Sequence, residues 1–407
     1  MVDRIGQLAP ALLWLAVLAL LPFPAVAELA LLAGALLGVL AALRGRVPWR
    51  APELTIVHLA FLGFWLPELV SAFDALDASR AWREAGADLR YLPFLWFAHA
   101  AFAERGSRAL ALRGVTIMVL AFALDGLVQA ATGAGLAGAT APDRLSGVFG
   151  AHDLKLGPVL AVLSPIALLV LQRRAGLPGL VLGFALLAPV VLLAGTRAAW
   201  LVFALALAGV LWHCYGPRRA AGFLLLGVAA LGAIGGGLYL GSARFAERVD
   251  RTAAAFGGDL AGLDHALAGR IAIWQAATAM ALEHPFNGVG VRGFRNAYPA
   301  YAAVDDRWLS AGQTAMHPHQ LVLEVAAETG AFGLLCWLGA AVAVLARLRR
   351  LPAAARRSAH APLLALAVLL FPINTHPALY SSFWSLLLFA LLGLLAGTLR
   401  GARQDAR

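Results

Sequence analysis

The segment MHPHQLVLEVAAETGAFGLLCWLGAAVAVLA, residues 316–346, places histidines and carboxylates directly before a long apolar run. About 20 helical residues cross the ~30 Å hydrocarbon core of a bilayer, and this run is long enough. Similar runs recur along most of the 407 residues, of which 61% are hydrophobic and 13% charged, with a mean hydropathy of +0.79. A soluble protein carries about 25% charged residues. The sequence therefore predicts an integral membrane protein.

Twelve apolar runs are candidate transmembrane helices. They cover residues 8–23, 25–43, 53–73, 90–103, 109–131, 155–171, 177–195, 198–214, 220–241, 319–346, 359–376 and 379–399. They are rich in leucine, alanine and glycine and lack the alternation of barrel strands, so they indicate helices. We expect an all-α polytopic membrane protein with about twelve helices. Helices one to nine would occupy 1–241, a large outer loop 242–318, and helices ten to twelve 319–407.

The basic residues predict the orientation of these helices. The net charge is +10, and arginines cluster in alternate loops. The clusters lie in residues 44–50, 105–113, 173–174, 218–219, 347–357 and 400–407. Because positively charged loops stay in the cytoplasm, both termini are predicted to be cytoplasmic, and the charge does not require nucleic acid binding. The first run also resembles a secretory signal, but it is long enough to span, so we expect residues 1–27 to be retained.

The predicted outer face also carries basic residues, and the loop 242–318 holds seven of them. Loops of this length in compact proteins are usually functional. Residues 267–285, LAGRIAIWQAATAMALEHP, are predicted to form an amphipathic helix. Its apolar stripe would contain Ile271, Trp274, Thr278 and Leu282. The glycines at 288, 290 and 293 fit GxGxxG, but a helix precedes them where a nucleotide site needs a strand, so we predict a tight turn.

The histidines before the tenth span are candidate catalytic groups. Pro318 suits the first turn of a helix, and a helix over 319–346 is predicted. His319 would then lie at the outer mouth, where a helix N-terminus favours the neutral imidazole, with Glu324 and Glu328 slightly deeper. A neutral histidine at the water boundary can act as a general base. Alternatively, the histidines only cap the helix, and the carboxylates only pair with arginines inside the bundle.

The same residues resemble a known family. His319-Gln320, nine residues and then Gly330-Ala331-Phe332-Gly333 match the pattern H-[NSQ]-x9-G-x-x-G of the O-antigen ligases. The segment EHPFNGVGVRGF, residues 283–294, is similar to an outer-loop signature shared with the O-antigen polymerases. The resemblance implies a C-type membrane glycosyltransferase (GT-C) of the bacterial inner membrane, with its active site facing the periplasm. Such an enzyme transfers a polysaccharide from undecaprenyl diphosphate to a sugar hydroxyl of lipid A-core by metal-independent inverting transfer.

That chemistry needs a base for the acceptor's proton and positive charge for the departing diphosphate. The resemblance implies His319 as the base and Arg197 and Arg270 as diphosphate ligands, because arginine binds phosphate oxygens bidentately. Supporting candidates are Glu324, Glu328, His317, Arg292, Arg295, Lys155 and Arg144. Alternatively, Arg197 is an interfacial snorkelling residue, Arg270 lies on a solvated helix face, and residues 144–158 form a plain turn. No cluster has convincing zinc-ligand spacing, so we expect no metal and no other cofactor.

Two other functions fit parts of the sequence. An O-antigen polymerase, or another transferase of lipid-linked glycans, would use a second lipid-linked glycan as acceptor. Polymerases often have two sizeable outer loops, whereas this chain has one dominant loop, which favours a ligase. A transporter can also have twelve spans, but the two halves show no obvious repeat, and the charges cluster on one face away from the midplane where transport sites lie. The expected partners are therefore the lipid-linked donor, the lipid A-core acceptor and membrane lipid.

Overall fold

The computed structural model describes residues 2–139, 144–151, 153–253, 264, 267 and 269–405, and these residues are mostly helical. The first helices are α1 (Val2–Ala19), α2 (Pro24–Leu43), α3 (Pro52–Ser71), α4 (Ala78–Asp88), α5 (Tyr91–Ala101), α6 (Arg105–Thr132), α7 (Leu156–Leu193) and α8 (Arg197–Gly241). The others are α9 (Ala243–Ala253), α11 (Arg270–Glu283), α12 (Phe294–Tyr301), α13 (Arg307–Ser310), α14 (Leu321–Arg350), α15 (Ala353–Ser358), α16 (His360–Leu369) and α17 (Ser382–Gln404). Short elements are η1 (Ala72–Asp74), η2 (Gly147–Phe149) and the hairpin of β1 (Ala134–Gly135) and β2 (Gly138–Ala139).

Seven helices of the described chain are long and apolar enough to cross a membrane, which confirms a multi-pass helical protein. They are α2, α3 with η1, α6, α7, α8, α14 and α17. Two of these, α7 and α8, are each broken at a glycine with non-helical backbone, Gly176 (φ 62°) and Gly216 (φ 73°). The halves of α7 fold against each other, because a Cβ on Gly183 would lie 2.7 Å from the Leu171 side chain. Four predicted spans thus correspond to the halves of two helices.

The total of twelve spans stays a prediction, because some matching helices are short. The fourth predicted span contains α5, whose 11 residues give about 16 Å at 1.5 Å per residue. The eleventh was predicted to reach residue 376, but α16 ends at Leu369. Pro372 disfavours helical backbone in the residue before it. The Asn374 side chain also donates hydrogen bonds to the carbonyls of Val368 (3.3 Å) and Leu369 (3.2 Å).

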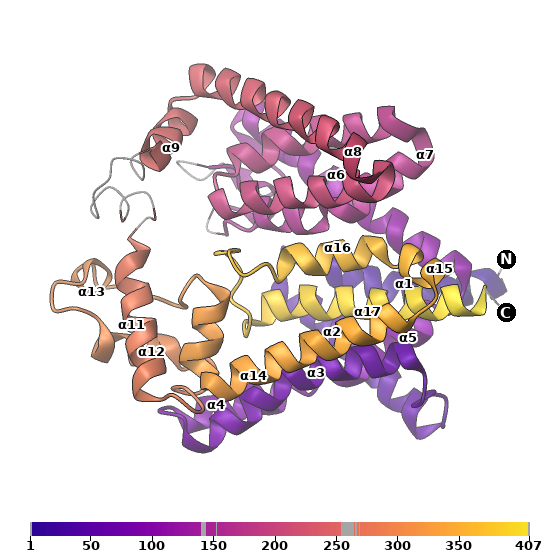
Figure 1. Cartoon of the computed structure of the whole chain (residues 1–407), viewed down its shortest axis with the longest axis horizontal. Helices are drawn as coiled ribbons and strands as arrows, with labels where there is room; N and C mark the ends of the chain where they lie inside the picture. Colours follow the sequence, from indigo (N-terminus) through magenta and orange to yellow (C-terminus); the bar gives the residue numbers. More distant parts are fainter. Residues whose placement is uncertain are drawn as a thin grey trace.

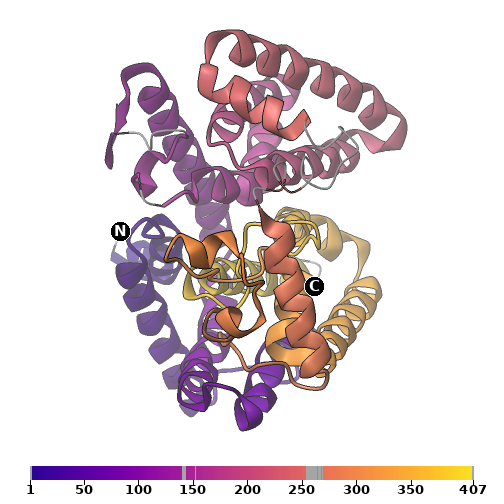
Figure 2. The ribbon, with the colours of Figure 1, turned by 90° about the vertical axis from the view of Figure 1, so that its left-hand side faces the viewer.

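The helices form two neighbouring groups (Figure 1). One contains α1 to α5 and α14 to α17 around α17, whose side chains from Phe383 to Leu399 are almost all buried. The other contains α6 to α9, and α16 contacts both α7 and α8. Both termini lie at one end of the molecule, whereas α11, α12 and α13 lie at the opposite end, here called the site end. Figure 2 looks onto the site end, with α11 and α12 in the foreground.

Candidate active site

The helix that carries the histidine motif begins later than predicted and is broken in its first third. Its first residue is Leu321, because Gln320 is extended (φ −157°) and its side-chain amide oxygen caps the N–H of Leu323. His319 therefore precedes the helix, and its backbone is left-handed (φ 55°). The break falls at Gly330, with φ 65° and ψ −163°. This region of backbone conformation is almost restricted to glycine, which explains the first glycine of the G-x-x-G motif.

The break in α14 is filled by the backbone of residues 285–290. The N–H of Val289 donates to the carbonyl of Ala327 (2.8 Å), and that of Gly290 donates to Glu328 (3.1 Å). In return, the N–H groups of residues 331 and 332 donate to the carbonyls of residues 285 and 286, at 2.8 and 3.0 Å. A Cβ at Gly288 would lie 2.4 Å from the Glu328 backbone, so only glycine fits there. The predicted tight turn is confirmed, and its backbone occupies the break in α14.

The two carboxylates of α14 are buried and position loops. Glu328 accepts hydrogen bonds from the N–H groups of Arg292 (2.8 Å) and Phe294 (3.4 Å). Glu324 accepts one from the N–H of Leu379 (2.9 Å) in the loop between α16 and α17. Neither forms a hydrogen bond with His319 in the described part of the chain. Glu324 or Glu328 could have oriented His319 as supporting residues, but in the structure both hold backbone N–H groups of other segments.

His319 lies against the loop between α16 and α17. The backbone of Thr375 hydrogen-bonds its ring, and the ring of His317 lies 3.9 Å away, centroid to centroid. Burial and then the charge of Arg270 lower the pKa of His319 to about 4. Its Nδ1 atom is buried without a hydrogen-bond partner. The imidazole is therefore neutral at pH 7, the form that a general base requires.

Arg270 and Arg197 belong to a group of basic residues beside His319. Arg270 donates a hydrogen bond to the hydroxyl of Thr375 (2.8 Å), in the loop between α16 and α17 against which His319 lies. Burial and then the charges of Arg197 and Arg144 lower the pKa of Arg270 to about 10. The guanidinium of Arg248 lies against Gly195, since a Cβ there would be 1.7 Å from it. We call the group the cationic cluster; it comprises Arg144, Lys155, Arg197, Arg248 and Arg270.

Lys155 is held at the edge of the cationic cluster. Its ammonium group pairs with Asp153 (2.7 Å) and lies 4.1 Å from the centroid of the Phe383 ring. It also acts electrostatically on His376, together with Arg144 and Arg270. The structure therefore brings the predicted residues Arg144, Lys155, Arg197, Arg270 and His319 into one region.

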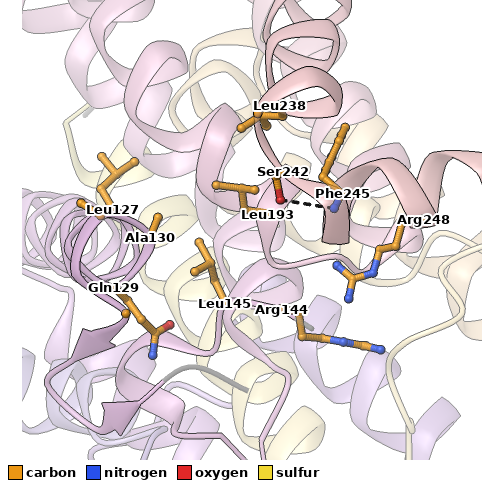
Figure 3. Close-up of a pocket in the computed structure, with 13 residues that line it drawn as sticks. Leu127, Gln129, Ala130, Arg144, Leu145, Leu193, Leu238, Ser242, Phe245 and Arg248 are labelled. Carbon is orange, nitrogen blue, oxygen red and sulfur yellow. Dashed lines mark hydrogen bonds between the residues drawn. The ribbon is translucent and has the colours of Figure 1, made fainter. Parts of the chain in front are cut away.

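A cavity of about 580 Å³ adjoins the cationic cluster (Figure 3). It lies between α6, α7, α8 and α9, and most of its lining is apolar, including Leu127, Leu193 and Phe245. The guanidinium groups of Arg144 and Arg248 lie together at one end. The cavity thus offers an apolar chamber with a positive end, which suits an amphipathic anion.

Arg292 and Arg295 lie in a different group from Arg197 and Arg270. Arg295 interacts with Arg292, Arg80 and Glu84, and burial is the main cause that lowers its pKa to about 10. The charges of Arg270 from one group and of Arg292 from the other both act on His317. Burial and then His319 lower the pKa of His317. The predicted site residues therefore form two groups, and His317 is within electrostatic reach of both.

His376 is a candidate site residue that the sequence analysis missed. It is half-buried, and its ring packs edge-on against Trp384 with centroids 5.6 Å apart. Desolvation and then His319 lower its pKa to about 3. A sequence signal was present, because His376-Pro377 repeats the His-Pro pair of residues 317–318 at the predicted outer end of a span.

The predicted apolar stripe of α11 was also wrong. Leu282 and Thr278 are exposed, while Ile273, Ala276, Ala277 and Met280 are buried. These residues face α14, and the alanines allow the two helices to approach closely. The residue of α11 that belongs to the cationic cluster is Arg270, the first residue of the helix.

These features define a class: a multi-span membrane protein with a neutral histidine and buried arginines at one end of its helices. Among the described residues no group of three or more His, Cys, Asp or Glu could hold a metal ion. A family model described as O-antigen ligase matches residues 182–338, and this match confirms the resemblance to the O-antigen ligase family. The matched residues contain Arg197, Arg270 and the whole histidine motif. Members are glycosyltransferase-like enzymes. No curated protein matches the chain.

Proposed function

We propose that the protein transfers O-antigen polysaccharide from undecaprenyl diphosphate to a sugar hydroxyl of lipid A-core at the periplasmic face of the inner membrane. The observation that carries this proposal is the neutral His319 beside the cationic cluster, next to an apolar cavity. A lipid diphosphate has a long hydrocarbon chain, which suits the apolar cavity, and a dense negative charge, which suits the cationic cluster. Arginine remains charged after partial burial and binds phosphate oxygens in pairs.

In the proposed reaction, Arg197 and Arg270 bind the diphosphate, with Arg144 and Lys155 in support. His319 takes the proton of the acceptor hydroxyl as its oxygen attacks the anomeric carbon from the face opposite the diphosphate. The bond between that carbon and the diphosphate oxygen breaks, and the diphosphate leaves with the electron pair. The configuration at the anomeric carbon is therefore inverted, and the guanidinium groups stabilise the negative charge that develops. No metal ion is part of this proposal.

His319 is a better candidate for the base than His317. The Nδ1 atom of His317 accepts a hydrogen bond from the N–H of His319 (3.3 Å), so that atom stabilises the strained backbone. The Nδ1 atom of His319 has no such role. We therefore expect His317→Ala to lower transfer less than His319→Ala.

The alternative within the same chemistry is a polymerase, which would place a lipid-linked glycan in the acceptor position. A deletion strain separates the two. Loss of capped lipid A-core with long chains still on the lipid carrier supports a ligase, whereas capped cores with single repeat units support a polymerase. Complementation with wild type should restore the profile, while His319→Ala should not. An unchanged glycan profile would exclude both and leave the transporter.

A further inference from the structure

A second arginine group lies at the site end. It comprises Arg80 of α4 with Arg292 and Arg295 at the start of α12, and we call it the α4 arginine group. Glu84 lies between two of them, 4.0 Å from the nearest guanidinium nitrogen of Arg80 and of Arg292. The N-cap Asp77 of α4 accepts a hydrogen bond from the Asn296 side chain (2.9 Å), which fixes α4 to α12.

These arginines have fewer partners than their burial requires. The Nε atoms of Arg80, Arg292 and Arg295 are all buried, and none has a hydrogen-bond partner in the described part of the chain. Arg90, at the N-cap of α5, shows the usual arrangement: it donates to Glu28 (3.0 and 3.1 Å) and to Asp88 (2.7 Å). Buried guanidinium donors without acceptors cost free energy. Glu84 comes only within 4.0 Å of Arg80 and Arg292, so the α4 arginine group keeps Nε donors that no acceptor in the described residues satisfies.

The backbone of this group is also strained. Arg292 and His319 are the two non-glycine residues with positive φ in the described chain, at 59° and 55°. Such conformations cost about 1–3 kcal/mol each and persist where the surroundings enforce them. The buried Glu328 carboxylate holds Arg292 in this conformation, because it accepts a hydrogen bond from the Arg292 N–H (2.8 Å). The fold therefore holds Arg292 in place at a cost, as binding sites often do.

Two exposed aromatic rings adjoin α4. Phe73 and Trp82 are 74% and 43% exposed, and their ring centroids lie 4.8 Å apart. The Trp82 indole has an apolar body and one polar N–H, which suits the boundary between membrane and water. A ligand that reaches the α4 arginine group would therefore approach over a surface at which the headgroup of a glycolipid can lie.

We infer that the α4 arginine group binds an anionic group, phosphate or carboxylate, on the oligosaccharide of the glycolipid acceptor. This inference rests on the proposed function. A transferase needs separate positions for donor and acceptor, and the charges of Arg270 from the cationic cluster and of Arg292 from the α4 arginine group both act on His317. An acceptor held by the α4 arginine group would therefore lie near the paired histidines while the cationic cluster holds the diphosphate.

The experiment measures binding and turnover separately with the full chain in detergent. The probe is purified lipid A-core, and a second probe is the same material freed of phosphate by hydrofluoric acid, which leaves carboxylates in place. Arg80→Ala and Arg295→Gln should weaken binding of lipid A-core at least about tenfold and raise its KM, with the donor KM unchanged. Arg83→Ala, an exposed arginine on the same helix, is the matched control and should change binding less than about twofold.

Each outcome has a defined meaning. If the variants lose their effect on the dephosphorylated probe, the anion is phosphate; if the effect persists, it is carboxylate. The inference is overturned if both variants bind like wild type, or if Arg83→Ala weakens binding as much as they do. Arginine-dependent binding in a wild-type protein that transfers nothing would refute the proposed reaction alone. Normal transfer with unchanged acceptor KM in folded variants would refute the acceptor site alone.

Discussion

Gly330→Ala tests whether the broken helix α14 supports the site. Alanine at φ 65° and ψ −163° is strained by about 1–3 kcal/mol. Its Cβ would lie 2.3 Å from the carbonyl oxygen of Phe286, and backbone atoms cannot move aside easily. If residues 285–286 move away from α14, the two hydrogen bonds from the N–H groups of residues 331 and 332 break, each worth about 0.5–1.5 kcal/mol. The free energy of unfolding should therefore fall by about 2–6 kcal/mol.

The assay compares thermal unfolding and transfer with those of Gly339→Ala. Gly339 lies in the same helix, and a Cβ there meets nothing within 4 Å. Alanine at a helical position costs nothing and can add about 1 kcal/mol, so this control should unfold at the same or a higher temperature. Gly330→Ala should unfold several degrees lower and lose most transfer, because Arg292 closely follows residues 285–290, which fill the break. Equal unfolding temperatures and equal transfer in the two variants would refute the reasoning.

The remaining predictions concern the chemistry, the metal requirement and the orientation. Loss of the base in His319→Ala should lower transfer about 10²- to 10⁴-fold without loss of donor binding, and near wild-type transfer would place the base elsewhere. Wild-type kcat/KM should stay level from pH 7 to 5 and fall as pH drops through about 4, because protonation at that pKa removes the base. Arg197→Ala or Arg270→Ala should each lower the transfer rate at least about tenfold, because a charged contact is worth about 1.5–3 kcal/mol, and lysine should restore it only partly. Transfer by the wild type should persist in excess EDTA. A rate that collapses in EDTA and returns with magnesium would contradict the metal-free reaction. In spheroplasts, an impermeant thiol reagent should label a cysteine near Arg248 but not one near Arg356.

The membrane helices could be predicted because their signal is local. Each apolar run depends only on its own residues, so the predicted spans fall on helices throughout the described chain. The halves of α7 and α8 were separated correctly for the same reason, since Gly176 and Gly216 lie beside arginine pairs that mark the ends of spans. Exact ends were less accurate where a side chain from another segment decides them. The Asn374 side chain, for example, caps α16 from beyond its last turn.

The grouping of the charged residues could not be predicted, because it depends on contacts between distant segments. The sequence presents Arg270, Arg292 and Arg295 within one loop, and they were expected to serve one site. Glu328 separates them by holding the Arg292 backbone to α14, while Thr375 holds Arg270 to the loop after α16. Both anchors lie outside the loop that carries the arginines. Glu328 thus keeps the Arg292 backbone with α14, while Glu324 binds the loop before α17. A single loop can therefore hold its arginines in two separate groups, provided that buried acceptors on neighbouring elements divide it.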